Sequence, residues 1–192
     1  MVESASRRAP TVPTAPWLEA APPALRIAFY GGSAAQAAAQ RVWGPEFSEQ
    51  ACRAHAQSTR ATLWLGPEEY LLLDFGVGQP PAEAPANEPP VWSALERELA
   101  GLPHALVDIS HRQFAFEVSG PHATAILNGA CPLDLDPGEF PVGMCTRTVL
   151  AKADIVLWRT QENAFHVEIW RSFAGYAAGI LTEIAAEFYP RH

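Results

Sequence analysis

Hydrophobic and polar residues alternate along several short segments in the first half of the chain, and this pattern predicts β-strands. The first strand, 25–30 (LRIAFY), is separated by a Gly-Gly-Ser turn from a helix predicted over 34–43. A hairpin with GPEE at its turn follows over 61–76, then a short helix over 91–101 and a strand over 105–109. The order strand, helix, strand, strand, helix, strand predicts a ferredoxin-like domain.

The second half starts again with a strand over 112–120 (RQFAFEVSG), followed by a short helix that ends near Gly129. Three further alternating segments predict strands: TRTVLA, DIVLWRT and AFHVEIW. The last segment predicts a helix over 173–189 with Ser172 as its N-cap. Its large apolar residues recur at spacings of three and four, which predicts that they form the buried face: Phe173, Tyr176, Ile180, Ile184 and Phe188.

These elements predict an α+β protein with two lobes in one compact unit. We expect a ferredoxin-like lobe over 25–109 and a second α+β lobe over 110–192. Residues 1–24 are rich in alanine and proline, which predicts a disordered or extended arm. Trp17 and Leu18 are apolar exceptions in this arm, and we expect them to dock on another surface.

Composition excludes several classes of function. The net charge of −8 over 192 residues gives no basic surface for nucleic acid, and no apolar run reaches the ~18 residues of a membrane span. The three cysteines are not arranged as C-x-x-C, and no secretory leader is visible, which indicates a reduced cytoplasmic protein. The six histidines are scattered, so we expect no metal site. The charged fraction of 18% is below the usual ~25%, which favours contact with a protein partner.

One run, VDISHR, places Asp108, Ser110 and His111 within four positions, and these are the residue types of a hydrolase catalytic site. In an extended chain Ser110 and His111 point to opposite sides, so they do not form the nucleophile–base pair of a triad. We interpret 108–112 as the joint between the lobes, with short polar side chains that satisfy turn amides. We expect Arg112 to pair with a carboxylate or to face a partner.

The other reactive residue types have ordinary structural interpretations. Cys131 has no base beside it in the sequence, which indicates a buried thiol. Asp134 and Asp136 lie in a turn-rich connection and are expected to cap turns. His166 lies in an alternating strand and is expected to be a hydrogen-bonded structural residue. The residues alone therefore predict no catalytic constellation.

Several motifs taken together resemble the gamma subunit of heterotetrameric sarcosine oxidase over about residues 60–177. The motifs are S-H-R at 110–112, S-G-P at 119–121, C-P-L-D-L at 131–135, F-P-x-G-x-C-x-R-T at 140–148, L-W-R at 157–159 and R-S-F at 171–173. The resemblance implies a fold similar to the folate-binding domain of the glycine-cleavage aminomethyltransferase. It also implies membership of a complex that oxidatively demethylates sarcosine to glycine, with hydrogen peroxide and methylenetetrahydrofolate as further products.

In that family the partners are the alpha, beta and delta subunits, which carry the cofactors: FAD, FMN, NAD, tetrahydrofolate and zinc. The resemblance therefore implies a structural or assembly role for this chain, a non-catalytic subunit of an oxidoreductase acting on CH–NH bonds, with no cofactor, metal or catalytic residue of its own. Within such a complex we expect Arg112, His111 and Trp17 to lie at subunit interfaces.

Two other functions remain open from the sequence. A stand-alone folate-binding or one-carbon transfer protein would need a carboxylate in a central pocket, for which Asp108, Asp134 and Glu168 are candidates. A hydrolase would use Ser110 or Cys131 as its nucleophile.

Overall fold

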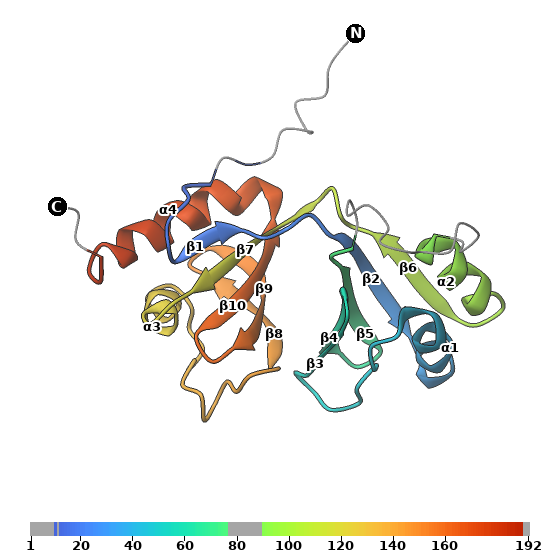
Figure 1. Ribbon diagram of the computed structural model, residues 1–192. Helices are drawn as coiled ribbons and strands as arrows, with labels where there is room; N and C mark the ends of the chain where they lie inside the picture. The colour runs from blue at the N-terminus through green and yellow to red at the C-terminus, as the bar shows by residue number, and fades with distance from the viewer. Residues whose placement is uncertain (1–9, 11, 77–89, 190–192) are drawn as a thin grey trace, which may run out of the picture.

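Two five-stranded antiparallel sheets stand face to face in the computed structural model, which describes residues 10, 12–76 and 90–189. The helices lie on the outer faces, so the order of layers is helices, sheet, sheet, helices (Figure 1). This arrangement confirms the α+β class and the two lobes. None of the described helices is long and apolar enough to cross a lipid bilayer.

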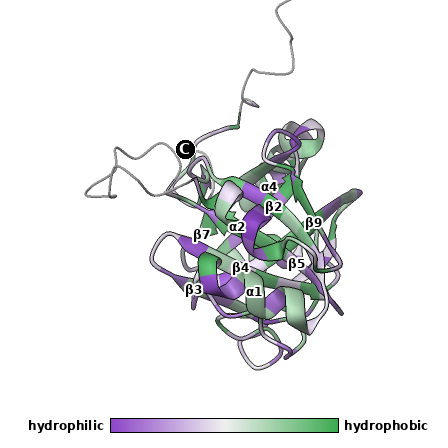
Figure 2. Ribbon diagram, turned by 90° about the vertical axis from the view of Figure 1, so that its right-hand side faces the viewer, coloured by the Kyte–Doolittle hydropathy of each residue, from purple (hydrophilic) through white to green (hydrophobic). Residues whose placement is uncertain are grey.

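The sheet of the first lobe has the strand order β3-β4-β5-β2-β6. Its strands are β2 (Leu25–Gly31), β3 (Ala54–Gln57), β4 (Arg60–Gly66), β5 (Glu69–Asp74) and β6 (His104–Asp108). Helices α1 (Ser33–Trp43) and α2 (Val91–Leu99) cover its outer face, as Figure 2 shows from their side of the molecule. The order β4-β5-β2-β6 is that of a ferredoxin-like sheet, as predicted. Strand β3 is an additional edge strand that the hydrophobic pattern did not indicate.

The sheet of the second lobe has the order β1-β7-β10-β9-β8. Its strands are β1 (Leu18–Ala20), β7 (Gln113–Ser119), β8 (Cys145–Leu150), β9 (Ala153–Gln161) and β10 (Ala164–Trp170). Helices α3 (Ala123–Asn128) and α4 (Ala174–Ala185) cover its outer face, and a 3-10 turn, η2 (Arg171–Phe173), leads into α4. The second sheet therefore includes a strand from the N-terminal part of the chain.

The docking of β1 changes the domain division expected from the sequence. Leu18 pairs with Val118, and the carbonyl of Trp17 accepts a hydrogen bond from the Ser119 amide. The Trp17 ring stacks on Tyr189 with the ring centroids 6.4 Å apart. Residues 12–24 thus belong to the second lobe, whereas residues 1–9 and 11 of the expected arm lie outside the described residues.

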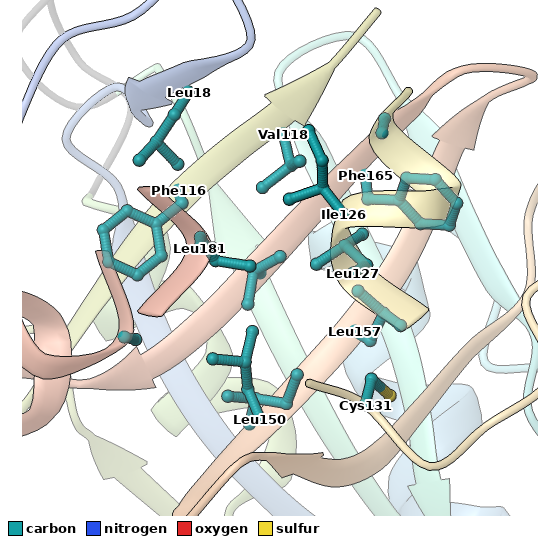
Figure 3. Close-up of a cluster of buried hydrophobic side chains, with 14 of the residues drawn as sticks. Leu18, Phe116, Val118, Ile126, Leu127, Cys131, Leu150, Leu157, Phe165 and Leu181 are labelled. Atoms are coloured by element: carbon teal, nitrogen blue, oxygen red, sulfur yellow. The ribbon is translucent and has the colours of Figure 1, made fainter. Parts of the chain in front are cut away.

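Each sheet packs its outer face against its helices. In the second lobe Phe116, Leu157 and Phe165 are fully buried beneath Leu127 of α3 and Leu181 of α4 (Figure 3). Each such side chain contributes about 1.5–3 kcal/mol by removing its surface from water. A similar cluster lies between the first sheet and α1 and α2.

The buried face of α4 differs from the prediction. Four alanines and one leucine are buried on the face toward the sheet: Ala174, Ala177, Ala178, Ala185 and Leu181. Phe173 and Tyr176 are exposed instead, and Ile180 is half-buried. Ile184 and Phe188, the other two residues of the predicted face, are partly buried and pack against the core. The reason is that alanines let the helix backbone approach the sheet closely, which large side chains prevent. Ser172 does not cap the helix, because the chain passes through η2 before α4 begins.

The two lobes are joined by backbone and by apolar contacts. The Ala54 amide donates to the Gly143 carbonyl at 2.8 Å, and the Cys145 amide donates to the Cys52 carbonyl at 3.0 Å. Above this edge, Leu63 and Leu71 of the first sheet pack with Cys145 and Val156 of the second. The inner faces of the sheets therefore meet along one side, and the polar site described next lies between them.

Candidate functional site between the lobes

Four ionisable side chains meet on the inner faces of the two sheets. Arg26 comes from β2 of the first lobe, Glu117 from β7, and His166 and Glu168 from β10 of the second lobe. Successive side chains of a strand point to opposite faces. Because Ile27, Phe165 and Val167 point into the outer cores, their neighbours Arg26, His166 and Glu168 must point between the sheets.

These side chains form one continuous hydrogen-bonded network. The Arg26 Nε donates to Glu168 Oε1 at 2.9 Å and to Oε2 at 2.7 Å, and its Nη1 donates to the Ala24 carbonyl at 3.1 Å. His166 Nε2 lies 2.9 Å from Glu168 Oε1, and His166 Nδ1 lies 2.6 Å from Glu117 Oε1. His166 and Glu168 are each 1% exposed, so water screens their mutual contact and the Arg26–Glu168 pair little, whereas the Glu117 side chain is 35% exposed.

The two glutamates determine the protonation state of His166. Burial alone lowers the pKa of this histidine, but the hydrogen bonds to Glu117 and Glu168 outweigh it and raise the pKa to about 9. At neutral pH the imidazole is therefore protonated and donates through both ring nitrogens. With Arg26 and His166 positive and Glu117 and Glu168 negative, the network has no net charge. His166 is thus hydrogen-bonded through both ring nitrogens, as expected from the sequence.

A second ion pair joins the lobes nearer the surface. Arg147 of β8 binds Glu69 of β5 in a bidentate pair, with Nη1 2.6 Å from Oε2, and the Tyr30 hydroxyl also donates to Glu69. The Arg147 hydrogen bonds lower the pKa of Glu69, and the Glu69 contact raises the pKa of the Tyr30 phenol. The Arg147 side chain is half exposed, so this pair is screened more than the buried network.

Between the buried network and this surface pair lies a cavity of about 280 Å³. Its lining comes from both lobes and is partly apolar, with Ala28 and Leu71 on one side and Val156 on the other. Glu168 lies on its lining, and so does Gln113, which is 9% exposed and whose amide oxygen has no partner. The mouth carries Tyr30, Arg112 and Trp170. We call this space the inter-lobe cavity.

The run Asp108–Arg112 forms the joint between β6 and β7, as the sequence indicated. Asp108 Oδ1 accepts the Ser110 amide at 2.8 Å, and Ser110 Oγ accepts the Arg26 amide at 2.9 Å. Ser110 and His111 form no hydrogen bond with each other in the described structure. The short polar side chains thus satisfy turn amides, and the Ser110 hydroxyl also holds β2 in place beside the Arg26–Glu168 pair.

The three residues expected at interfaces have different positions. Arg112 is exposed, and its guanidinium lies 5.0 Å from the centroid of the Trp170 ring at the cavity mouth. His111 is exposed, and its carbonyl accepts a hydrogen bond from Arg171 Nε at 3.1 Å. Trp17 is 5% exposed, because the surface on which it docks is the second lobe of its own chain. Arg112 and His111 are therefore accessible in this chain, and Trp17 is not.

The remaining chemical candidates of the sequence are not brought together. Cys131 is buried, with Sγ 3.7 Å from Thr148 Oγ1, as expected for a structural thiol. Asp134 Oδ1 accepts the Asp136 amide at 2.9 Å, a turn contact that confirms its expected role. Burial raises the pKa of the Cys145 thiol to about 12, which keeps it protonated and unreactive. Among the described residues, no three His, Cys, Asp or Glu side chains gather as a metal site.

Of the three candidate carboxylates for a folate site, only Glu168 lies on the cavity lining. Its two oxygens already accept hydrogen bonds from Arg26 and His166. The site therefore does not fit a ligand ring that requires this carboxylate as its own acceptor. The sequence analysis did not predict the hydrogen-bonded network around Glu168. The available signal was Arg26, a charged residue within the otherwise apolar strand LRIAFY.

Comparison with known proteins adds independent information. Residues 31–187 match the model of the sarcosine oxidase, gamma subunit family. Sarcosine oxidase subunit gamma of Corynebacterium sp. (strain U-96) is 32% identical over 131 residues, and that of Arthrobacter sp. is 33% identical over 158 residues. These alignments cover 68% and 82% of this chain, and 58% and 72% of the two relatives. The first alignment thus spans little more than half of the relative's own length.

Solved structures agree with the sequence comparison. A chain of the heterotetrameric sarcosine oxidase from Corynebacterium sp. U-96, in complex with pyrrole 2-carboxylate, superposes with a TM-score of 0.78 at 26% identity. The match covers 91% of this chain and 86% of the other. Glycine cleavage system aminomethyltransferase T from Bartonella henselae superposes with a TM-score of 0.60 at 15% identity, over 85% of this chain and 44% of that one. The second likeness concerns the fold alone.

Proposed function

The chain belongs to the sarcosine oxidase gamma subunit family, and from this premise we propose that it is a structural subunit of a multi-subunit sarcosine oxidase. The proposed complex oxidises sarcosine with dioxygen to glycine and hydrogen peroxide, and transfers the methyl carbon to tetrahydrofolate as methylenetetrahydrofolate. The proposed partners are alpha, beta and delta subunits, which would carry FAD, FMN, NAD, tetrahydrofolate and zinc. The contribution of this chain is shape and contact surface.

The single observation that carries the structural role is the closure of the buried network. Arg26, Glu117, His166 and Glu168 satisfy one another across the two lobes, and their charges cancel. A catalytic acid or base must direct an atom that donates or accepts a proton toward the substrate. In this network both ring nitrogens of His166 are hydrogen-bonded to glutamates. The arrangement fixes the lobes relative to each other, which is what a subunit that presents a composite surface requires.

The cysteines are consistent with a complex in a reducing compartment. Cys52, Cys131 and Cys145 are all unpaired, and two of them are buried. This supports our proposal that the complex works in the cytoplasm, where thiols stay reduced.

The test of this function is co-expression with candidate alpha, beta and delta subunits, followed by size exclusion with detection of flavin absorbance. We expect this chain to elute with the flavin as one species and to be colourless when purified by itself. A chain that never co-elutes with flavin-bearing subunits contradicts the proposal. Titration of the isolated chain with tetrahydrofolate, followed by tryptophan fluorescence, tests the rival function. Saturable quenching at micromolar concentrations supports a stand-alone folate-binding protein instead.

A further inference from the structure

The mouth of the inter-lobe cavity carries large apolar side chains that this chain leaves in water. Tyr30 is 43% exposed and Trp170 46% exposed, and both lie on the cavity lining. Val107 of β6 is 49% exposed and pairs with Ala28, so it lies beside the same cavity wall on the inner face of the first sheet. We call Tyr30, Val107, Arg112 and Trp170 the mouth surface. Aromatic and arginine residues grouped in this way are typical of protein interfaces.

Arg112 gives the mouth surface its charge. Its guanidinium stacks on Trp170 at 5.0 Å, yet it makes no hydrogen bond or ion pair with any residue that the structure describes. A guanidinium has five N–H donors and binds carboxylates in a bidentate manner. The other cations near the cavity, Arg26 and Arg147, are already paired with glutamates. In a chain with a net charge of −8, Arg112 is thus a local site for an acidic group.

Two further polar side chains on the cavity lining, Asp154 and Gln113, indicate which groups an occupant carries. Asp154 is exposed and has no ion pair within the described ranges, whereas Glu69 and Glu168 do. Gln113 presents an amide whose oxygen lacks a partner. An occupant that matches this lining has a bulky apolar part for the walls, a carboxylate for Arg112 and N–H donors for Asp154 or Gln113.

The extent of the exposed apolar area favours a protein partner over a free ligand. This area continues beyond the cavity of about 280 Å³ to Val107, which is 49% exposed. Strand β6 ends the first sheet, and most of its residues are exposed. Unpaired apolar edges of this kind are commonly covered by another chain.

We propose that the mouth surface docks a neighbouring subunit, which inserts a bulky apolar side chain into the inter-lobe cavity and pairs a carboxylate with Arg112. This inference rests on the proposed function, because it specifies where the subunit assembles. The cavity exists only while both lobes are held together, so the Arg26–Glu168 pair preorganises the docking site.

The test uses the co-expressed complex with an affinity tag on another subunit. Arg112→Glu reverses the charge at the mouth, and Trp170→Ala removes the ring beneath Arg112. Arg97→Glu is the matched control, because Arg97 is an exposed arginine on α2, on the opposite side of the first sheet. We expect the first two variants to reduce co-purification of this chain at least tenfold, and the control to leave it unchanged. Circular dichroism and the thermal midpoint of each isolated variant check that it is folded.

A cross-link then locates the contact. In a Cys52→Ser background, which removes the accessible native thiol, Val107→Cys carrying a benzophenone maleimide should cross-link to a partner peptide that contains an acidic residue. The Cys52→Ser chain without Val107→Cys, treated in the same way, should not. Reversal of that acidic residue to lysine should restore assembly with Arg112→Glu.

The outcomes separate this inference from the proposed function. Folded Arg112→Glu and Trp170→Ala variants that assemble as the wild type does overturn the docking surface but leave the subunit role in place. Failure of the wild-type chain itself to assemble overturns both. Normal assembly of Arg112→Glu with loss of a small bound molecule in native mass spectrometry assigns the cavity to a ligand and overturns the docking proposal.

Discussion

Arg26 of the first lobe and Glu168 of the second lobe form a buried ion pair, with the arginine Nε 2.7 Å from the glutamate Oε2. They are 142 positions apart in the chain, and their side chains are 6% and 0% exposed. The pair lies at the centre of the joint, with the Ser110 hydroxyl on one side and His166 on the other. The lobes are therefore held in one arrangement by polar contacts as well as by apolar packing.

Removal of one member of this pair should be costly. Glu168→Ala leaves the Arg26 guanidinium buried without its carboxylate, and we expect a loss of about 3–5 kcal/mol in the free energy of unfolding. The double variant Arg26→Met with Glu168→Leu should lose less than either of its single variants, because neither member of the pair is left as a buried charge and His166 keeps its partner Glu117. Urea unfolding of these four variants measures this. The matched control is Glu98→Ala, which breaks a surface pair with Arg41 and should cost less than about 1 kcal/mol.

His166 should make the free energy of unfolding decrease at alkaline pH. Its pKa is raised from 6.5 to about 9 by hydrogen bonds to Glu117 and Glu168, with Arg26 beyond Glu168 as the opposing charge. A histidine whose pKa is higher in the folded state stabilises the fold fully below pH 6.5 and loses this contribution as pH rises through about 9. The urea midpoint should therefore fall between pH 7 and pH 10. In His166→Gln this decline should be absent; an unchanged decline contradicts the assignment.

The surface pair of Glu69 and Arg147 should contribute little and should respond to salt. Arg147→Ala is expected to cost about 0.2–1 kcal/mol, because the Arg147 side chain is half exposed. The difference from wild type should shrink in 1 M sodium chloride, where screening is strong. A double-mutant cycle with Glu69→Gln at two salt concentrations measures it. An effect of several kcal/mol that is independent of salt contradicts the distinction between the surface pair and the buried pair.

Ser110 should matter for stability and not for chemistry. Its hydroxyl accepts the Arg26 amide, so Ser110→Ala leaves that N–H without a partner and should cost about 1–3 kcal/mol. Turnover per flavin in the assembled complex should be unchanged. Stoichiometric labelling of Ser110 by a fluorophosphonate probe, or a collapse of turnover in a fully assembled Ser110→Ala complex, contradicts the structural role and supports a hydrolase.

Trp17 should behave as a core residue of the second lobe. It is 5% exposed and packs on the helical side of the sheet beside Tyr189. Trp17→Ala is therefore expected to cost about 3–5 kcal/mol in the isolated chain. Thermal unfolding of the isolated chain measures this without any partner. A variant as stable as wild type that fails to assemble would restore the sequence-based prediction that Trp17 lies at an interface.

Local pattern was sufficient for much of the fold. Alternation identified β2, β4, β5 and β6, and their order with two helices correctly predicted a ferredoxin-like lobe. Strand β1 was missed because its three residues become a strand only by pairing with β7. Local propensity cannot report a partner 100 positions away, as Val118 is from Leu18. The face of α4 was misassigned because periodicity weighs large residues, whereas close packing on this sheet selects alanines.

The candidate site was predictable only in part. Asp108 accepts a hydrogen bond from the Ser110 amide, only two residues away, so the known preference of such side chains for turns was enough to predict this contact. The Arg26–Glu168 pair was not predictable, since it depends on how two lobes face each other. A charged residue within each of the strands LRIAFY and AFHVEIW was the available signal. Charged residues among apolar strand residues are rarely buried without a partner. The opposite charges in these two strands were therefore a signal that the strands face each other.

The most direct measurement of the central claim is the turnover number for sarcosine per flavin, compared with the activity of this chain alone. We predict that the isolated chain is colourless and produces no peroxide from sarcosine. We also predict that complexes assembled with Ser110→Ala or Arg97→Glu turn over at the wild-type rate per flavin. Sarcosine-dependent peroxide from the isolated chain, or a yellow chromophore bound to it, would contradict the claim that this chain contributes structure while the oxidation takes place on its neighbours.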